Sequence, residues 1–168
     1  MANIGWGKPR IIVQKLDAEG NGTGDWIELD TPVEGTTTLA TTKGDKQEAK
    51  IEGGENEDVR YNKNTYALSL EIRAVKGRKK PIADDDGIIN DKYQVYLQPE
   101  DAGVDGFHMP MTTVSVEDNW DTEDGGSWVY TFDALKKDKD TKQLIWDQVE
   151  VNPETGPISS VTLKSDNA

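Results

Sequence analysis

Apolar and polar side chains alternate every two residues along most of this chain, and this period constrains the fold more than any other feature. The clearest segment, residues 64–75, carries on one side Tyr66, Leu68, Leu70, Ile72 and Ala74. Successive side chains of a β-strand point to opposite faces of the sheet, so this segment is predicted to be a long, half-buried strand. An apolar stripe with the 3.6-residue helical period is not sustained anywhere in the sequence. The chain is therefore predicted to be mainly β.

The same alternation defines about eight or nine strands, separated by stretches rich in Gly, Asn and Asp. The predicted strands are residues 10–16, 25–29, 36–42, 46–53, 64–75, 92–98, 112–118, 127–135 and 143–151. Short turns between successive strands favour antiparallel pairing. We expect a β-barrel or β-sandwich with at most one short helix, around residues 81–91.

With 168 residues, the chain is long enough for one domain with its own hydrophobic core. Residues 1–151 hold all the predicted strands and are expected to form this β domain. Residues 152–168 contain Pro153 and Pro157 among Ser, Thr and Asn, with one apolar alternation. They are expected to form an exposed C-terminal tail or a docking arm.

The composition excludes several classes of function. The chain has no Cys and a single His, His108, which removes disulfides, thiolate nucleophiles and Cys-ligated zinc. A net charge of −13 argues against ordinary binding of a phosphate backbone. The sequence has no long apolar run, and residues 1–10 lack the apolar segment of a signal peptide, so we expect no membrane contact and no export signal. We expect no catalytic residues, no enzymatic activity and no cofactor.

One loop has the spacing of an EF-hand calcium site. Its candidate ligands are Asp17, Glu19, Asn21, Asp25 and Glu28. An EF-hand needs a helix on each side, whereas both flanks alternate as strands do. A hairpin loop rich in Gly and Asn explains the same residues without an ion, so no metal site is predicted.

Five Trp in an acidic β chain also suggest a carbohydrate-binding β-sandwich, because sugar rings stack on aromatic faces. Trp128 alternates with Tyr130, and Trp146 lies in an apolar strand, so both are expected in the core. Trp6, Trp26 and Trp120 lie near turns or the N-terminus, where they are free to bind a ligand. This module is the alternative function.

Clusters of opposite charge follow the longest predicted strand. They comprise Lys76, Arg78, Lys79 and Lys80, and then Asp84, Asp85 and Asp86. Such patches suit contacts between identical subunits arranged head to tail. A solvated charged loop is the alternative.

Three segments carry a resemblance to a known family. They are residues 44–73, GDKQEAKIEGGENEDVRYNKNTYALSLEIR; residues 92–101, KYQVYLQPED; and residues 115–135, SVEDNWDTEDGGSWVYTFDAL. In this order, a charged strand, an acidic loop, a long alternating strand and a late acidic hairpin resemble the major tail proteins, or tail tube proteins, of long-tailed bacteriophages and prophages. The resemblance covers residues 35–151.

The resemblance implies a fold related to the type VI secretion tube, a β-barrel or β-sandwich flanked by a short helix. Hexameric rings would stack into a tube around the tape measure protein and contact other tail proteins. The chain would assemble in the bacterial cytoplasm and act in the virion tail, where DNA passes through without specific binding. The residues expected to face the lumen are Lys46, Glu48, Lys50, Glu52, Glu71 and Arg73.

The segment 53–64 is expected to be a poorly ordered loop that becomes ordered when rings stack, because it has little to bury. Its expected inter-ring contacts are Glu55, Glu57, Asp58, Val59 and Tyr61, with basic groups such as Lys79 and Lys80 on the next ring. An ordinary hairpin connection is the alternative.

Overall fold

The computed structural model describes residues 7–153 and 156–167. The chain is mainly β, as predicted. In chain order the strands are β1 (Arg10–Lys15), β2 (Ile27–Glu28), β3 (Thr38–Thr42), β4 (Lys46–Lys50), β5 (Asn56–Tyr61), β6 (Thr65–Arg73), β7 (Ile88–Gln98), β8 (Gly106–Asp121), β9 (Gly125–Ala134), β10 (Ile145–Asp147), β11 (Val149–Asn152) and β12 (Ser160–Leu163). A single 3₁₀ turn, η1 (Lys164–Asn167), follows β12 in the described part of the chain.

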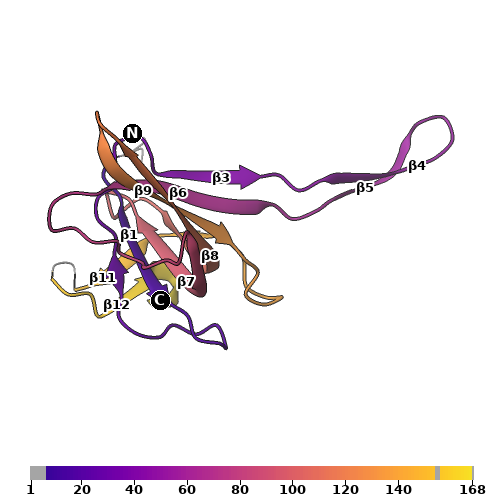
Figure 1. The fold of residues 1–168 in the computed structure, drawn as a ribbon. Coiled ribbons are helices and arrows are strands. Elements are labelled where there is room, and N and C mark those ends of the chain that lie inside the picture. Colours follow the sequence, from indigo (N-terminus) through magenta and orange to yellow (C-terminus); the bar gives the residue numbers. More distant parts are fainter. Residues whose placement is uncertain (1–6, 154–155, 168) are drawn as a thin grey trace.

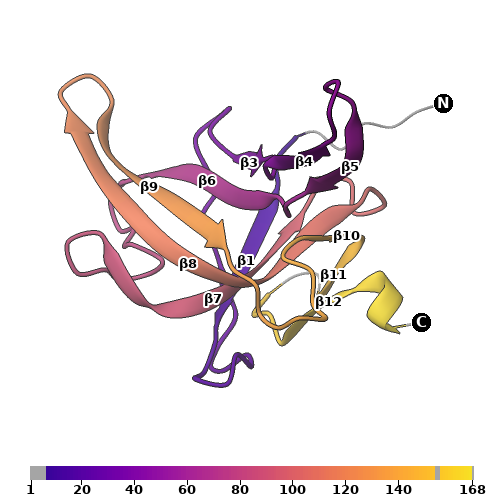
Figure 2. The same ribbon diagram turned by 90° about the vertical axis from the view of Figure 1, so that its right-hand side faces the viewer.

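One antiparallel sheet organises the molecule. Its strands follow the order β2-β1-β7-β8-β9-β6-β3, and β10 joins by pairing with β8. In the described residues β2 and β3 do not pair with each other, so the sheet is open rather than a closed barrel. Figure 2 shows the sheet as strongly curved, with the long β8–β9 hairpin running across it.

The main core lies on the concave face of this curved sheet. Its fully buried side chains include Leu68, Leu70 and Ile72 of β6 and Tyr130 and Phe132 of β9. These residues belong to the two faces whose alternation is clearest in the sequence, so the predicted inward faces of both strands are confirmed. Burial of one face is what holds the register, because a slip of one residue would expose the whole set.

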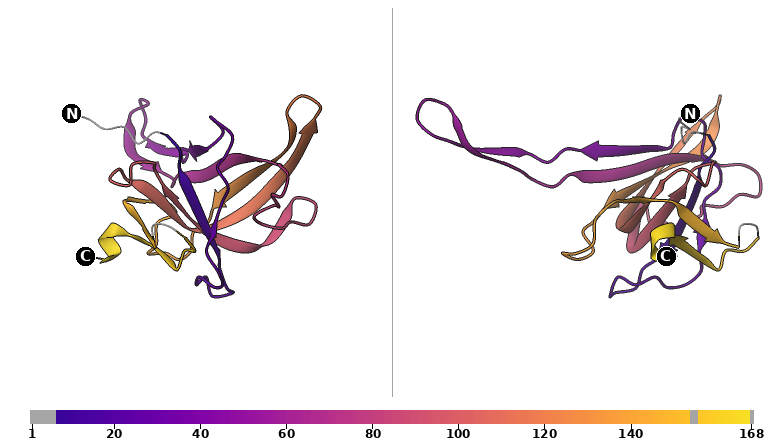
Figure 3. Two further views of the ribbon diagram at one scale, coloured as in Figure 1. Left: turned by 90° about the vertical axis from the view of Figure 1, so that its left-hand side faces the viewer. Right: turned by 180° about the vertical axis from the view of Figure 1, so that it is seen from behind.

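A second, smaller core lies on the opposite face of β1 and β7. There Ile12 and Tyr96 pack against Val151, Val161 and other apolar residues of the β11–β12 hairpin. Strand β1 therefore buries both faces, since Ile11 and Val13, on either side of Ile12, belong to the main core. Figure 3 shows the β11–β12 hairpin beside the sheet, as a second layer.

This second core changes the predicted division of the chain. The boundary after Val151 falls inside β11, whose partner β12 comes from the predicted tail. Val161 and Leu163 are only 3% and 2% exposed. Residues 160–163 are therefore part of the β domain, whereas residues 154, 155 and 168 of the predicted tail lie outside the described part.

Two details differ from the sequence analysis. At most one short helix was expected, and its candidate segment, residues 81–91, instead contains turns and the first residues of β7. The structure has more strands than the eight or nine expected, since the segment 143–151 divides into β10 and β11 and the sequence pattern missed β5 and β12.

Candidate assembly surfaces

Strands β4 and β5 form a two-stranded arm that extends the β3–β6 edge of the sheet into solvent. Figure 1 shows the arm leaving the sheet beyond β3 and β6. All residues of both strands are exposed. Half of the segment 53–64, which was expected to be a poorly ordered loop, forms the strand β5. It pairs with β4 from Lys46–Tyr61 to Lys50–Asn56, with a shift of register between Ala49 and Lys50.

A tight junction joins the arm to the sheet. The backbone N–H of Asn62 donates to the carbonyl of Asp45 at 2.9 Å. The N–H of Gly44 donates to the side-chain oxygen of Asn64 at 3.0 Å. A Cβ at position 44 would lie 1.9 Å from the carbonyl oxygen of Asn62, so only glycine allows the two chains to approach this closely.

The strand predicted to present a wholly charged face shares that face with apolar side chains of β5. Lys46 lies opposite Tyr61, and Glu48 lies opposite Val59, so these four side chains project on the same side. The Nζ of Lys46 lies 2.7 Å from a carboxylate oxygen of Glu48, and this hydrogen bond lowers the pKa of Glu48. The ammonium of Lys43 lies 5.1 Å from the centre of the Tyr61 ring.

The other residues expected in the lumen lie elsewhere. Glu71 and Arg73 are near the end of β6 that points away from the arm, opposite Val129 and Ser127 of β9. Arg73 donates to the carbonyl of Asp124 at 3.2 Å. The structure therefore does not bring Glu71 and Arg73 together with the charged residues of the arm.

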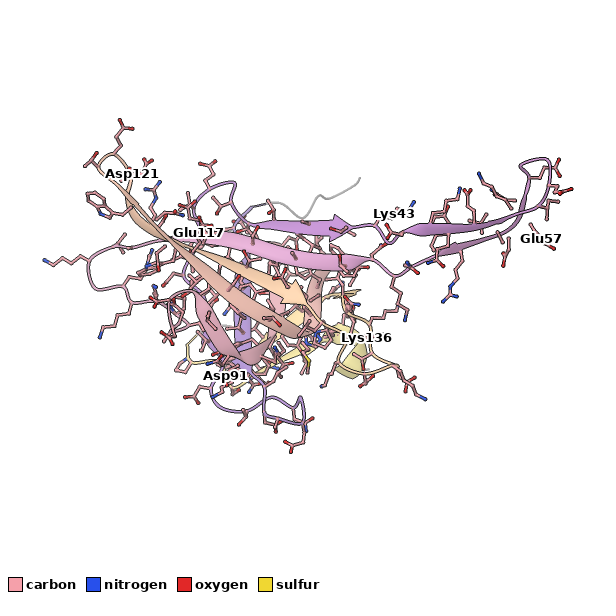
Figure 4. All side chains as sticks on the ribbon, turned by 45° about the vertical axis from the view of Figure 1, so that its right-hand side comes forward. Lys43, Glu57, Asp91, Glu117, Asp121 and Lys136 are labelled. Atoms are coloured by element: carbon pink, nitrogen blue, oxygen red, sulfur yellow. The ribbon has the colours of Figure 1, made fainter. Side chains whose placement is uncertain are left out.

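The tip of the arm is acidic. It carries Glu52, Glu55, Glu57 and Asp58, all exposed. Figure 4 shows Glu57 near the far end of the arm and Lys43 near its root. The far end of the arm therefore carries carboxylates, while its stem carries the lysines.

Part of the predicted inter-subunit cluster is used inside the chain. Lys80 contacts Asp84 at 2.8 Å and Asp118 at 2.7 Å, and these carboxylates raise the pKa of Lys80. The hydrogen bonds from Lys80 and from the Gly87 amide lower the pKa of Asp84. Arg78 lies 3.4 Å from Asp30.

The exposed remainder of this cluster is smaller than expected. Lys76 and Lys79 have no ion-pair partner within the described residues, and both side chains are exposed. The amide of Asp85 donates to the carbonyl of Ile88, and Asp86 has a positive φ of 49°, so both belong to the turn that leads into β7.

The calcium candidate is a loop held by its own side chains. A carboxylate oxygen of Asp17 accepts hydrogen bonds from the amides of Glu19 and Asn21, at 3.0 and 2.9 Å. Glu28 is paired with Arg10 at 2.5 Å. Among the residues that the structure describes, His, Cys, Asp and Glu do not gather in any group of three or more that could hold a metal ion.

The tryptophans divide differently from the prediction. Trp128 packs against the main core as expected, but Trp146 is 58% exposed, with one edge of its surface against the ring of Phe107. Trp26 is half-buried against Tyr96, and Trp6 lies outside the described residues. Trp120 stands out, because it is 74% exposed at the end of the β8–β9 hairpin.

The single histidine, His108, packs against other side chains of the sheet. His108 stacks on Tyr96 with 3.9 Å between ring centres, and its Nε2 lies 3.2 Å from the side-chain oxygen of Gln94. Burial, with a smaller contribution from Lys137, lowers the pKa of His108 to about 4. The ring is therefore neutral at pH 7 and packs as part of the sheet.

The sequence interpretation missed one surface, a basic cleft at the root of the arm. The cleft has a volume of about 420 Å³, and its lining includes Lys63, Lys136 and Lys142. The available signal was the run KKDKDTK at residues 136–142, which is lysine-rich in an otherwise acidic chain.

Comparison with known proteins leaves the resemblance without independent support. No protein-family model matches the chain, and no curated protein matches it. Within the described residues, none of the helical structure is long and apolar enough to cross a membrane.

Proposed function

We propose that this chain is a non-enzymatic, self-assembling structural protein, the subunit of a phage or prophage tail tube. The observation that carries the proposal is the β4–β5 arm, whose two strands are exposed along their whole length. An extension of this kind lets a subunit reach a neighbour, and no residue of β4 or β5 belongs to either core in the described part of its own chain.

The energetics of the arm support a partner. An isolated two-stranded hairpin is marginally stable in water at best. This arm also exposes apolar surface, since Ile51, Val59 and Tyr61 are 46%, 39% and 55% exposed. Contact with another subunit would bury this surface, at about 25 cal/mol for each Å² of apolar area.

The resemblance of residues 35–151 directs the proposal to a tail tube. In this proposal, hexameric rings stack around the tape measure protein and join the other tail proteins of the virion. A net charge of −13 suits the wall of a channel for DNA, since phosphates are repelled and the genome passes without binding.

Electron microscopy of concentrated protein tests this proposal, with an arm-shortened variant for comparison. Because the backbones of Asp45 and Asn62 are hydrogen-bonded, residues 46–61 can be replaced by a two-residue Asn-Gly turn. We expect tubes from the wild-type chain, and a folded variant that forms none. The control Gly54→Asn changes only the tip of the arm, where an added Cβ meets nothing within 4 Å, and it should assemble normally. Tubes from the arm-shortened variant would contradict the role of the arm.

A carbohydrate-binding module is the second candidate, supported by one observation. The exposed Trp120 lines a cleft of about 480 Å³ together with the polar side chains of Glu71, Arg73, Asp121 and Asp124. An aromatic face beside carboxylates is the usual composition of a sugar site. A glycan-array signal that Trp120→Ala abolishes, from a protein that stays monomeric, would favour this candidate over the tube.

A further inference from the structure

Two exposed surfaces with opposite charge lie far apart on the molecule. One is the tip of the β8–β9 hairpin, which we call the acidic tip, defined by Trp120, Asp121, Glu123 and Asp124. The other is the cleft at the root of the arm, which we call the basic cleft. Figure 4 shows Asp121 on one side of the molecule, and Lys136 and Lys43 on the other.

The acidic tip presents one aromatic side chain among carboxylates. Trp120 is 74% exposed, more than any other large apolar side chain in the described part of the chain. The sequence has no Lys or Arg between Glu117 and Ser127, although Arg73 of β6 reaches this hairpin and donates to the carbonyl of Asp124. The side chain of Asp121 holds the turn, since its carboxylate oxygen accepts hydrogen bonds from the amide of Glu123, at 2.9 Å, and from that of Asp124. The indole is thus held out on a rigid hairpin.

The basic cleft has complementary chemistry. Its lining combines Lys63, Lys136 and Lys142 with the apolar surface of Tyr66 and Leu144, and includes no carboxylate among the described residues. Lys136 donates to the carbonyl of Thr141 at 2.6 Å, which shapes the loop on this side of the cleft. An indole is smaller than the cleft volume of about 420 Å³, and ammonium groups are attracted to the face of a Trp ring.

The wall of the cleft also contains an unsatisfied acceptor. The side-chain oxygen of Gln143 is buried and has no hydrogen-bond partner in the described part of the chain. A buried acceptor without a partner costs about 1–3 kcal/mol. The indole N–H of Trp is a donor with no acceptor function, so a small opening of the wall would let it supply the missing bond.

The acidic tip cannot fill the basic cleft of its own chain. The tip precedes the first residue of β9, Gly125, and the loop of the cleft follows its last residue, Ala134. A strand rises about 3.3 Å per residue, so β9 itself separates the two surfaces by about 30 Å. The tip can therefore reach this cleft only on another copy of the chain.

We propose that the acidic tip of one copy docks into the basic cleft of the next, with Trp120 as the anchor. The inference rests on the proposed self-assembly and names the two surfaces that meet. Because these surfaces differ, the contact is head to tail and repeats from copy to copy, closing into a ring or extending as a filament. Buried Trp side chains are frequent hot spots of protein interfaces.

Two variants, each with one disabled surface, test the contact by sedimentation velocity. Trp120→Ala disables the tip, and Lys63→Glu with Lys142→Glu disables the cleft. We expect wild-type oligomers that grow with concentration and shrink with added salt. Each variant alone should be a monomer, with association weakened at least about 30-fold. A mixture of the two should form a 1:1 complex and nothing larger, because each partner supplies the surface that the other lacks.

Matched controls separate the contact from general effects. Trp146→Ala removes another exposed indole, and Lys8→Glu with Lys164→Glu makes the same charge change away from both surfaces; both should assemble as the wild type does. Wild-type association by either disabled variant alone would overturn the inference, as would a mixture that stays monomeric. Retention of a single-stranded DNA probe by a monomeric wild type, lost in the cleft variant, would assign the cleft to nucleic acid and also overturn it.

The outcome also distinguishes this inference from the proposed function. Tubes that need the arm but tolerate both disabled variants would refute the tip-to-cleft contact and leave the tail tube standing. Head-to-tail oligomers that obey the mixing test, without rings or tubes in micrographs, would support the contact and contradict the tail tube.

Discussion

Replacing Gly44 by Ala should release the arm from the sheet without unfolding the domain. The added Cβ would lie 1.9 Å from the carbonyl oxygen of Asn62 and 2.7 Å from that of Lys63. Both are backbone atoms, so the returning chain has to move by more than an ångström. This shift breaks the hydrogen bond from Asn62 to Asp45 and the one from Gly44 to Asn64.

The magnitude follows from those two bonds. Each contributes about 0.5–1.5 kcal/mol, so the junction loses about 1–3 kcal/mol, which is enough to open a marginal hairpin. The two buried cores contain no residue from 43–64 among those that the structure describes. The global free energy of unfolding should therefore change by less than about 1 kcal/mol.

Two measurements separate the local effect from the global one. Native-state hydrogen exchange of residues 46–61 should accelerate in Gly44→Ala, while urea denaturation followed by Trp fluorescence should be nearly unchanged. The matched control is Gly54→Asn at the arm tip, where a Cβ meets nothing within 4 Å and Asn tolerates the positive φ of 83°. Unchanged exchange in Gly44→Ala, or a global loss above about 2 kcal/mol, would refute the reasoning.

Three further predictions concern the stability of the domain. Tyr130→Phe should lower the free energy of unfolding by about 1–3 kcal/mol in urea denaturation, because it removes the 2.8 Å hydrogen bond to the buried carbonyl of Ile82; no loss would show that water replaces the hydroxyl. Leu163→Ala should cost about 2–5 kcal/mol by the same assay if residues 160–163 belong to the core, and almost nothing if they form a loose tail. The pKa of His108 is lowered to about 4 from 6.5, so the native state binds fewer protons than the unfolded state, and stability should fall as pH drops through this window. The loss should approach about 3 kcal/mol and should be missing from His108→Gln; equal pH profiles would contradict it.

The strands that the sequence predicts well are those with a covered face. The alternation of residues 64–75 and 127–135 reappears as β6 and β9, whose inward side chains fill the main core. Trp146 was misplaced for a related reason. It lies in a continuous apolar run, which does not distinguish one face from the other, and β10 is a three-residue strand that pairs on one side only in the described structure.

The pattern of residues 46–61 could not reveal the arm, because alternation reports a strand but not whether anything covers it. The charged alternation in β4 predicted that one face of this strand is exposed to solvent, and in the structure both faces are exposed. Strand β5 was missed because Val59 and Tyr61 are its only large apolar residues and neither packs in a core.

The basic cleft could not be predicted from the sequence, since segments that are far apart in the chain form it together. Lys63 follows the arm, whereas Lys136 and Lys142 come more than seventy residues later, after β9. Only the sheet order, which places β9 beside β6, brings them to one place. The same strand β9 holds the acidic tip at its other end, so a single hairpin fixes both the separation of the two surfaces and their opposite direction. Any contact between them must therefore join different copies, and it must give the resulting assembly a polarity.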